Sequence, residues 1–159
     1  MGLFLINTEQ MLIGKLSRGA YKPFSINDKI FIEKNLYSLL GARLLFKGYY
    51  NEDGKKLAET IGFNVREKIP YLIGYKKNNK DEFLKRYGKE YENIMEDKAK
   101  FEELLKVQGR TDLLNELEMV VIASHYTDEE IKNAQNMPYK VNLYTWSLVD
   151  KILIFNKIS

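Results

Sequence analysis

Glu33, Glu59 and Lys76 are the residues of this chain whose types and positions could support metal or acid–base chemistry. A carboxylate can hold Mg²⁺ through oxygen, and a lysine can position or deprotonate an attacking water. Glu59 falls in one predicted strand and Lys76 at the end of the next, so an antiparallel pairing would bring them to one end of a sheet. Glu33 lies three residues from both Ile30 and Leu36, which places its carboxylate inside or beside the apolar stripe of a helix. By spacing alone, solvated charges at strand ends remain the alternative.

Composition excludes several classes of chemistry. The 159 residues include no cysteine and a single histidine, His125, which excludes disulfides, thiolate sites and multi-histidine metal clusters. No G-x-S-x-G pattern accompanies His125, and we interpret it as a loop residue. The chain has no Walker loop and no G-x-G-x-x-G, so a nucleotide-cofactor enzyme is unsupported. No apolar run approaches about 18 residues and no signal segment opens the chain, so we expect a cytoplasmic protein without a membrane partner.

The charge of the chain is unevenly distributed. Its 25 Lys and Arg residues and 22 Asp and Glu residues leave a formal net charge of +3. The densest basic window runs from Arg66 to Lys89, with eight basic and three acidic side chains. The aromatic residues interleaved with them are Tyr71, Tyr75, Phe83 and Tyr87. Because basic groups neutralise phosphates and aromatic faces stack on bases, this window is typical of a nucleic-acid interface, although a solvated lysine-rich face has the same composition.

Apolar patterning indicates the elements that would position these residues. Strands are predicted over residues 2–6, 11–16, 43–50, 57–65, 69–76, 118–124, 139–146 and 149–155, with a tight turn over 51–54. Helices are predicted over residues 25–40 and 81–107 and in a short segment after residue 127. Ser25 and Asp28 have the spacing of a capping box, and Gly41 is expected to end this first helix. Thr127 and Glu130 have the same spacing at the start of the last helix.

The order of elements predicts one α/β domain over residues 1–159, a mixed central β-sheet flanked by helices. Within it we expect an N-terminal hairpin over residues 1–24, a motif-bearing core over 25–110, and C-terminal strands with a short helix over 111–159. The apolar face of the first helix is predicted to include Ile26, Ile30, Leu36 and Leu40. No internal repeat, low-complexity tract or linker interrupts the pattern.

The sequence resembles the PD-(D/E)XK, or restriction-endonuclease-like, superfamily. It is most similar to a small prokaryotic branch related to the single-strand-specific endonuclease domain, some members of which are called predicted transport proteins. The stretches that carry the resemblance are Phe31–Leu36, Ala58–Phe63, Tyr71–Lys77, Asp97–Glu102, Val121–Ser124 and Tyr139–Tyr144. They follow the order of the family's first helix, two motif strands, long helix and closing strands. The resemblance therefore implies a restriction-endonuclease-like fold.

The resemblance also implies roles for individual residues. Glu33, Glu59 and Lys76 correspond to catalytic positions, with Glu59 in place of an aspartate. Glu59 and the backbone carbonyl of Tyr75 would be the ligands of Mg²⁺, the cofactor expected only if the protein is active. Where the family has a metal-binding glutamate, however, this chain has Gly74.

The loss of that carboxylate should weaken metal binding and make the local field more positive. Glu82 and Glu90 are candidates for a displaced carboxylate. The family's helix glutamine corresponds to Arg86, and an arginine of a late strand is replaced by Thr145.

Three functions remain open. The first is a nucleic-acid-binding domain on a degenerate nuclease-like fold without efficient cleavage, in which Lys76, Lys77 and Arg86 contact phosphates of DNA or RNA and Tyr75 stacks on a base. The second is an active Mg²⁺- or Mn²⁺-dependent endonuclease that uses Glu59 and Lys76. The third is a protein-interaction module or inhibitor on the same scaffold, acting as a homodimer or with a protein partner.

Overall fold

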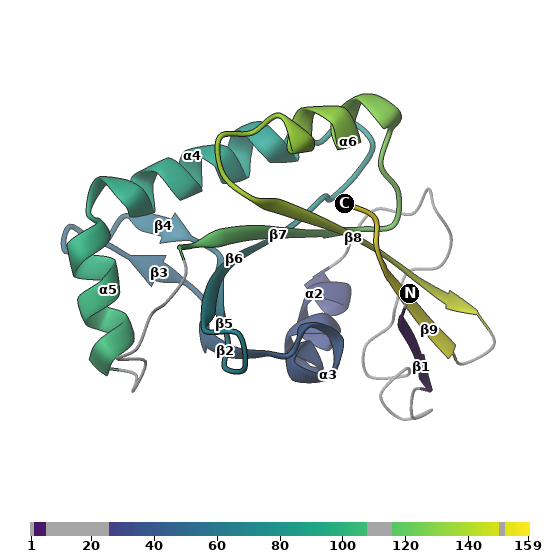
Figure 1. The fold of residues 1–159 in the computed structure, drawn as a ribbon, viewed down its shortest axis with the longest axis horizontal. Helices are drawn as coiled ribbons and strands as arrows, with labels where there is room; N and C mark the ends of the chain where they lie inside the picture. Colours follow the sequence, from purple (N-terminus) through teal and green to yellow (C-terminus); the bar gives the residue numbers. More distant parts are fainter. Residues whose placement is uncertain (1, 6–25, 108–115, 150–151) are drawn as a thin grey trace.

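The computed structural model of the chain describes residues 2–5, 26–107, 116–149 and 152–159. In chain order its elements are β1 (Gly2–Leu5), α2 (Ile26–Lys34), α3 (Leu36–Leu40), β2 (Ala42–Phe46), β3 (Tyr49–Tyr50), β4 (Lys56–Ala58), β5 (Thr60–Asn64), β6 (Ile69–Tyr75), α4 (Phe83–Glu96), α5 (Lys98–Val107), β7 (Glu118–Ala123), α6 (Asp128–Gln135), β8 (Val141–Val149) and β9 (Ile152–Lys157). Figure 1 shows how they are arranged. No helix in the described part of the chain is long and apolar enough to cross a membrane.

A mixed β-sheet forms the centre of the molecule, as the sequence predicts. Over the described residues the sheet has seven strands in the order β1-β9-β8-β7-β6-β5-β2. The three strands β6, β7 and β8 are parallel, and the other neighbouring pairs are antiparallel. Helices α4 and α5 connect β6 to β7, and α6 connects β7 to β8, as parallel neighbours require a crossover.

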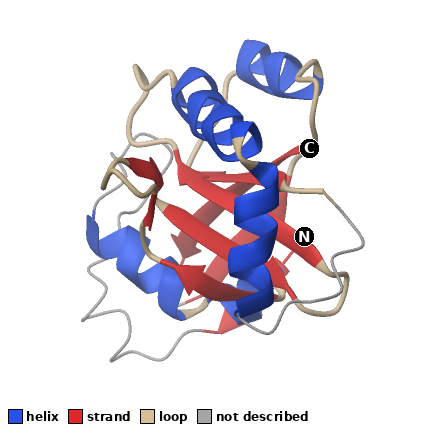
Figure 2. Cartoon of the chain, turned by 90° about the vertical axis from the view of Figure 1, so that its left-hand side faces the viewer, coloured by secondary structure: helices blue, strands red, loops and turns tan. Residues whose placement is uncertain are grey.

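Helices cover both faces of this sheet. Helices α4 and α6 lie above the sheet in Figure 1 and α2 and α3 lie below it, and the turned view of Figure 2 also shows helices on both sides of the strands. The core on the α4 side includes Leu72, Tyr87, Ile94, Leu105 and Leu143. The core on the α2 side includes Phe31, Ile32, Ile73, Tyr75 and Trp146. Alternate residues of the central strands therefore belong to two separate hydrophobic layers.

The first helix differs from its prediction in both continuity and orientation. It is divided at Asn35, whose side-chain Nδ2 donates to the carbonyl of Phe31 at 2.8 Å. Ile26 and Ile30, predicted to be buried, are 67% and 41% exposed, so this half of the predicted apolar face is wrong, whereas Leu36 is buried and Leu40 packs partly buried against the same core. Besides Leu36 and Glu33, the buried side carries Asp28, Phe31 and Ile32, because Phe31 and Ile32 fill the layer beneath the sheet. The expected end at Gly41 is confirmed by its left-handed conformation, with φ of 67°.

Two predicted strands are each divided into a piece in the main sheet and a piece outside it. The strand predicted over residues 43–50 becomes β2 and β3, and the one predicted over 57–65 becomes β4 and β5, with Glu59 at the break. Strands β3 and β4 pair with each other as a separate two-stranded ribbon. The tight turn predicted between them is confirmed: Gly54 donates its N–H to the carbonyl of Asn51 at 3.0 Å and has φ of 81°. Glu59 thus lies where the chain passes from the ribbon into the sheet.

The terminal elements also differ from expectation. β1 pairs with β9, and the predicted hairpin partner over residues 11–16 and the predicted cap at residue 25 lie outside the described residues. The long helix predicted over 81–107 is divided at Asp97 into α4 and α5. The capping box of Thr127 and Glu130 at the start of α6 is confirmed.

Candidate functional site at the end of the central strands

The start of β5 and the end of β6 lie at the same end of the central strands. These strands are antiparallel, and Thr60 pairs with Ile73, so residue 59 and residues 75–77 come to the same end. Helix α2 covers one face of this end and α4 the other. Lys29, Glu59, Lys77, Arg86 and Glu90 gather here, and we refer to these five residues as the strand-end cluster.

Glu59 is the centre of the strand-end cluster. Its Oε2 atom lies 3.6 Å from Nζ of Lys29 on α2, and its Oε1 atom lies 3.7 Å from Nζ of Lys77. Its backbone N–H donates to Oε1 of Glu90 on α4 at 3.2 Å. One carboxylate therefore contacts two ammonium groups, one from α2 and one from the segment that follows β6.

Glu90 is a half-buried carboxyl group with an unusual pKa. Burial, together with the negative charge of Glu59, raises the pKa of Glu90 to about 7. The hydrogen bond from the backbone of Glu59 and the positive charges of Arg86 and Lys56 act in the opposite direction. Glu90 therefore exchanges its proton near neutral pH.

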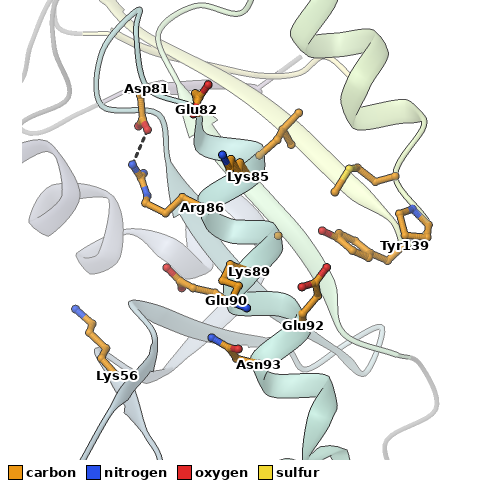
Figure 3. Close-up of a pocket in the computed structure, with 14 residues that line it drawn as sticks. Lys56, Asp81, Glu82, Lys85, Arg86, Lys89, Glu90, Glu92, Asn93 and Tyr139 are labelled. Atoms are coloured by element: carbon orange, nitrogen blue, oxygen red, sulfur yellow. Dashed lines mark hydrogen bonds and ion pairs between the residues drawn. The ribbon is translucent and has the colours of Figure 1, made fainter.

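Arg86 holds the end of β6 against α4. Its Nη2 atom donates to the carbonyl oxygen of Tyr75 at 2.9 Å, and its Nη1 atom forms an ion pair with Asp81. The guanidinium carbon lies 4.6 Å from the centroid of the Tyr87 ring. In Figure 3, Arg86 and Glu90 lie on one flank of α4, whereas Glu92 and Tyr139 lie on the other.

Glu33 is buried beneath the strand end, as its helical position predicts. Its Oε2 atom accepts a hydrogen bond from Oγ1 of Thr60 at 2.7 Å. Tyr75 belongs to the same layer and is almost completely buried, at 1% exposure. Burial and the neighbouring Glu33 charge raise the pKa of the Tyr75 phenol well above its usual value. The Tyr75 ring, expected to stack on a base, therefore packs inside the protein.

Lys76 points to the opposite face of the sheet from Glu33. Its Nζ atom donates to Oε1 of Glu130 at 2.8 Å and to the carbonyl of His125 at 3.1 Å. The rings of Phe83 and Tyr126 lie about 6 Å from the same atom. Because the side chain is only 4% exposed, the structure does not bring Lys76 to a position where it could contact Glu33 or a phosphate on the surface.

Gly74 is enclosed by Tyr87. A Cβ atom at position 74 would lie 2.5 Å from two carbons of the Tyr87 ring, much closer than a van der Waals contact. The Tyr87 hydroxyl accepts a hydrogen bond from the backbone N–H of Tyr75 at 2.9 Å and lies 3.3 Å from its carbonyl oxygen. The volume that a glutamate side chain would need at position 74 is thus filled by an aromatic ring.

The residues at the strand end do not fit a Mg²⁺ ion. The carbonyl of Tyr75, one of the two expected ligands, accepts hydrogen bonds from Arg86 and Tyr87. The carboxylate of Glu59, the other, is flanked by Lys29 and Lys77, which repel a cation. In the described ranges of the chain, no three acidic or histidine side chains are grouped so that they could hold a metal ion.

Some residues of the strand-end cluster were predicted from the sequence, and one was not. Glu59, Lys77 and Arg86 were expected there, and Glu90 was a candidate for a displaced carboxylate. Lys29 was missed, although it lies one helical turn before Glu33 and its neighbouring position on the helix could have indicated it.

A groove of about 870 Å³ extends the site along α4, with Lys56, Arg86 and Glu90 in its lining. Because its lining residues occupy both flanks of the helix, we treat the groove as an open surface rather than a closed pocket. Comparisons of this chain with protein-family models, with curated proteins and with solved structures give no match, so the chemistry of the site rests on its own geometry.

Proposed function

We propose that this chain is a nucleic-acid-binding domain on a degenerate restriction-endonuclease-like scaffold that does not cleave efficiently. The order of its central elements supports this: a helix bearing a buried glutamate is followed by antiparallel strands β2, β5 and β6, a helical crossover, and the parallel strand β7. This is the order that the sequence resemblance implies.

The observation that carries the proposal is the pair of lysines around Glu59. Lys29 and Lys77 each lie within 3.7 Å of one carboxylate oxygen of Glu59, and Lys77 is half exposed. Phosphate oxygens can replace that carboxylate as partners of both ammonium groups, because a phosphodiester, like a carboxylate, carries one negative charge on two acceptor oxygens. Lys77 keeps its expected role as a phosphate contact, Lys29 takes the place of the buried Lys76, and Arg86 contributes positive charge behind them.

Two features argue against cleavage at this site. Lys76, the expected catalytic lysine, is paired with Glu130 on the far side of the strand. Gly74 has no carboxylate, and Tyr87 occupies the space beside it. Binding without chemistry is therefore what the cluster supports best.

A fluorescence-anisotropy titration with labelled 20-nucleotide single strands and duplexes of DNA and RNA tests the proposal. We expect Lys29→Ala combined with Lys77→Ala to weaken the affinity for the tightest-binding probe at least fivefold. The slope of log K against log salt should fall by about 1.4 for a single strand, since each lost phosphate contact removes about 0.7. The matched control is Lys106→Ala combined with Lys132→Ala, two exposed lysines on α5 and α6. Equal affinities of the two double variants would contradict the proposal.

An active metal-dependent endonuclease is the second candidate, and one contact favours it. Glu90 lies against the backbone of Glu59, so a second carboxylate is present from α4 although position 74 has none. Incubating the same probes with Mg²⁺, Mn²⁺ or EDTA separates the two functions. For the binding domain, Glu59→Gln removes a charge that competes with phosphate and should tighten binding about threefold. For the endonuclease, the same substitution should abolish cleavage.

A further inference from the structure

The ribbon of β3 and β4 holds two consecutive tyrosines with opposite surroundings. Tyr49 is buried, and its ring packs against Phe46 and Phe101 at centroid distances of 5.8 and 5.6 Å. Tyr50 faces the other way and is 56% exposed. Because successive strand residues point to opposite faces, anchoring Tyr49 in the core holds Tyr50 on the outside.

The outward face of the ribbon combines an aromatic ring with positive charge. Tyr50 and Lys56 are register partners across β3 and β4, beside a shift in the register of the ribbon, and both are exposed. Lys47 and Lys55, also exposed, are close in the chain. The acidic Glu52 of the intervening turn forms an ion pair with Lys100 of α5.

The Tyr50 ring has a defined support. A Cβ atom at position 48 would lie 2.9 Å from Cε2 of Tyr50, so the ring lies directly over the backbone of Gly48. The turn beyond it is closed by Asn51, whose Oδ1 accepts from the N–H of Lys55 at 2.9 Å. A ring held in place loses little conformational entropy when a ligand stacks on it.

The ribbon face is continuous with the strand-end cluster. Lys56 lines the same groove as Arg86 and Glu90, and β4 leads directly into Glu59. A strand of nucleic acid that contacts Lys77 and passes Arg86 along the flank of α4 would next reach Lys56 and Tyr50. The lysines of the ribbon can bind phosphates, and the exposed Tyr50 ring can stack on an unpaired base.

We propose that Tyr50 is a base-stacking residue and that the β3–β4 ribbon, with Lys56, makes this chain selective for single-stranded nucleic acid. The inference rests on the proposed nucleic-acid-binding function and adds the class of ligand. In duplex DNA or RNA the base faces are stacked on one another, so Tyr50 has a binding partner only where bases are unpaired.

The test compares Tyr50→Ala and Tyr50→Phe with Tyr37→Ala. Tyr37 is the matched control, because it is also an exposed tyrosine, at 65% exposure, but lies on α3 beneath the other face of the sheet. With labelled 20-nucleotide DNA and RNA single strands, Tyr50→Ala should weaken binding about fivefold or more, whereas Tyr50→Phe and Tyr37→Ala should stay within twofold of the unchanged chain. With the matching duplexes, all three variants should stay within twofold.

Photocrosslinking gives a direct readout of stacking. Single strands that contain 5-iodouracil crosslink to an aromatic ring on which the base stacks, and mass spectrometry should map the crosslink to Tyr50. Crosslinks mapped only to other residues, or equal losses of single-strand and duplex affinity in Tyr50→Ala, would overturn the inference. Circular dichroism of each variant verifies that the ribbon substitution leaves the domain folded.

The outcomes separate the inference from the function on which it rests. If the Lys29 and Lys77 double variant loses affinity and Tyr50→Ala does not, the ribbon inference is overturned and the proposed function stands. If Tyr50→Ala alone loses single-strand affinity, the ribbon inference is supported and the strand-end cluster is not the phosphate site. If the unchanged chain binds none of the probes, both are overturned and a protein partner becomes the hypothesis to pursue.

Discussion

The charge of Lys76 is compensated inside the protein. Its ammonium group is enclosed by Glu130, the carbonyl of His125 and two aromatic rings. Removing one partner of such a pair leaves the other poorly solvated, which costs more than the pair itself contributes. This gives Lys76 a structural role between β6 and α6.

Lys76→Met should therefore lower the free energy of unfolding by about 2–3 kcal/mol, a value reduced from that of a fully buried pair because Glu130 keeps some exposure. Lys77→Met, on the adjacent and half-exposed residue, should change it by less than about 0.5 kcal/mol. Urea unfolding of both variants measures the difference. Similar midpoints for the two variants would contradict the assignment of Lys76 to the interior.

Glu90 gives the stability of the protein a pH dependence with a definite sign. Its pKa is raised from 4.5 to about 7 in the folded protein, so between these values the folded state holds a proton that the unfolded state has lost. Stability from this group is therefore present at low pH and is lost as pH rises toward 7.

Glu90→Gln should stabilise the protein at pH 8 by about 1–2 kcal/mol relative to the unchanged chain, and by almost nothing at pH 4. The expected stabilisation is smaller than the full pKa shift of Glu90 would give, because the group is only half buried and solvent screens its charge. Glutamine can still accept the hydrogen bond from the backbone of Glu59. Glu92→Gln, the same substitution on the other flank of α4, is the matched control. Thermal unfolding across pH 4–8 measures it, and parallel curves for both variants would contradict the expected shift.

The sequence could not indicate which face of β6 carries Lys76. Residues 70–75 are buried whichever way they point, so the strand is almost continuously apolar and shows no alternation. Lys76 was grouped with Glu59 because both stand at strand ends, whereas the pleat of the strand places it with Leu72 and Gly74 against α4. The burial of Glu33 was predictable from its spacing of three residues from the buried Leu36, which is a local property, although Ile30, the other neighbour used, is exposed.

At the scale of elements, the packing of α4 on β6 depends on the absence of a side chain at position 74. Gly74→Ala should lower the free energy of unfolding by about 2–3 kcal/mol, because its Cβ would overlap the Tyr87 ring. In a Tyr87→Leu background the same substitution should cost clearly less, which a double-mutant cycle measures. In a Tyr87→Phe background the cost should be unchanged, since the ring and not the hydroxyl makes the clash. Equal costs in the leucine background would show that the ring is not the obstacle.

The existence of most elements was predictable, but their interruptions were not. Alternation and helical spacing located the strands and helices, and capping chemistry located the start of α6. The breaks fall at the polar residues Asn35, Glu59 and Asp97, and polar residues are equally common inside an unbroken element, so they are a weak local signal. Ile26 and Ile30 are exposed because Phe31 and Ile32 pack against the sheet. Helix propensity does not predict which face of a helix makes such a tertiary contact.

At the scale of the whole molecule, one sheet separates two cores that share every central strand. We expect them to unfold together, because the loss of either layer exposes the same strands to water. Trp146 is the single tryptophan of the chain, and it reports on the α2 side. Leu105 lies fully buried on the α4 side.

Leu105→Ala should lower the free energy of unfolding by about 2–4 kcal/mol. It should shift the midpoint seen by Trp146 fluorescence and the midpoint seen by far-ultraviolet circular dichroism by the same amount. Guanidinium unfolding followed by both probes makes the measurement. A shift in circular dichroism with an unmoved fluorescence midpoint would mean that the two cores unfold independently.

The pairing of β1 with β9 has a consequence for how the molecule is made. Gly2 is the register partner of Phe155, and Leu5 that of Ile152, so the outer strand of the sheet is formed by the two most distant parts of the chain. On a ribosome, β1 emerges long before β9 and can pair with it only after β9 has left the exit tunnel. This pairing closes a loop of about 150 residues, so the sheet is completed only after β9 has been synthesised. Nascent chains stalled before residue 152 should therefore leave the backbone of β1 open to protease, and released chains should protect it.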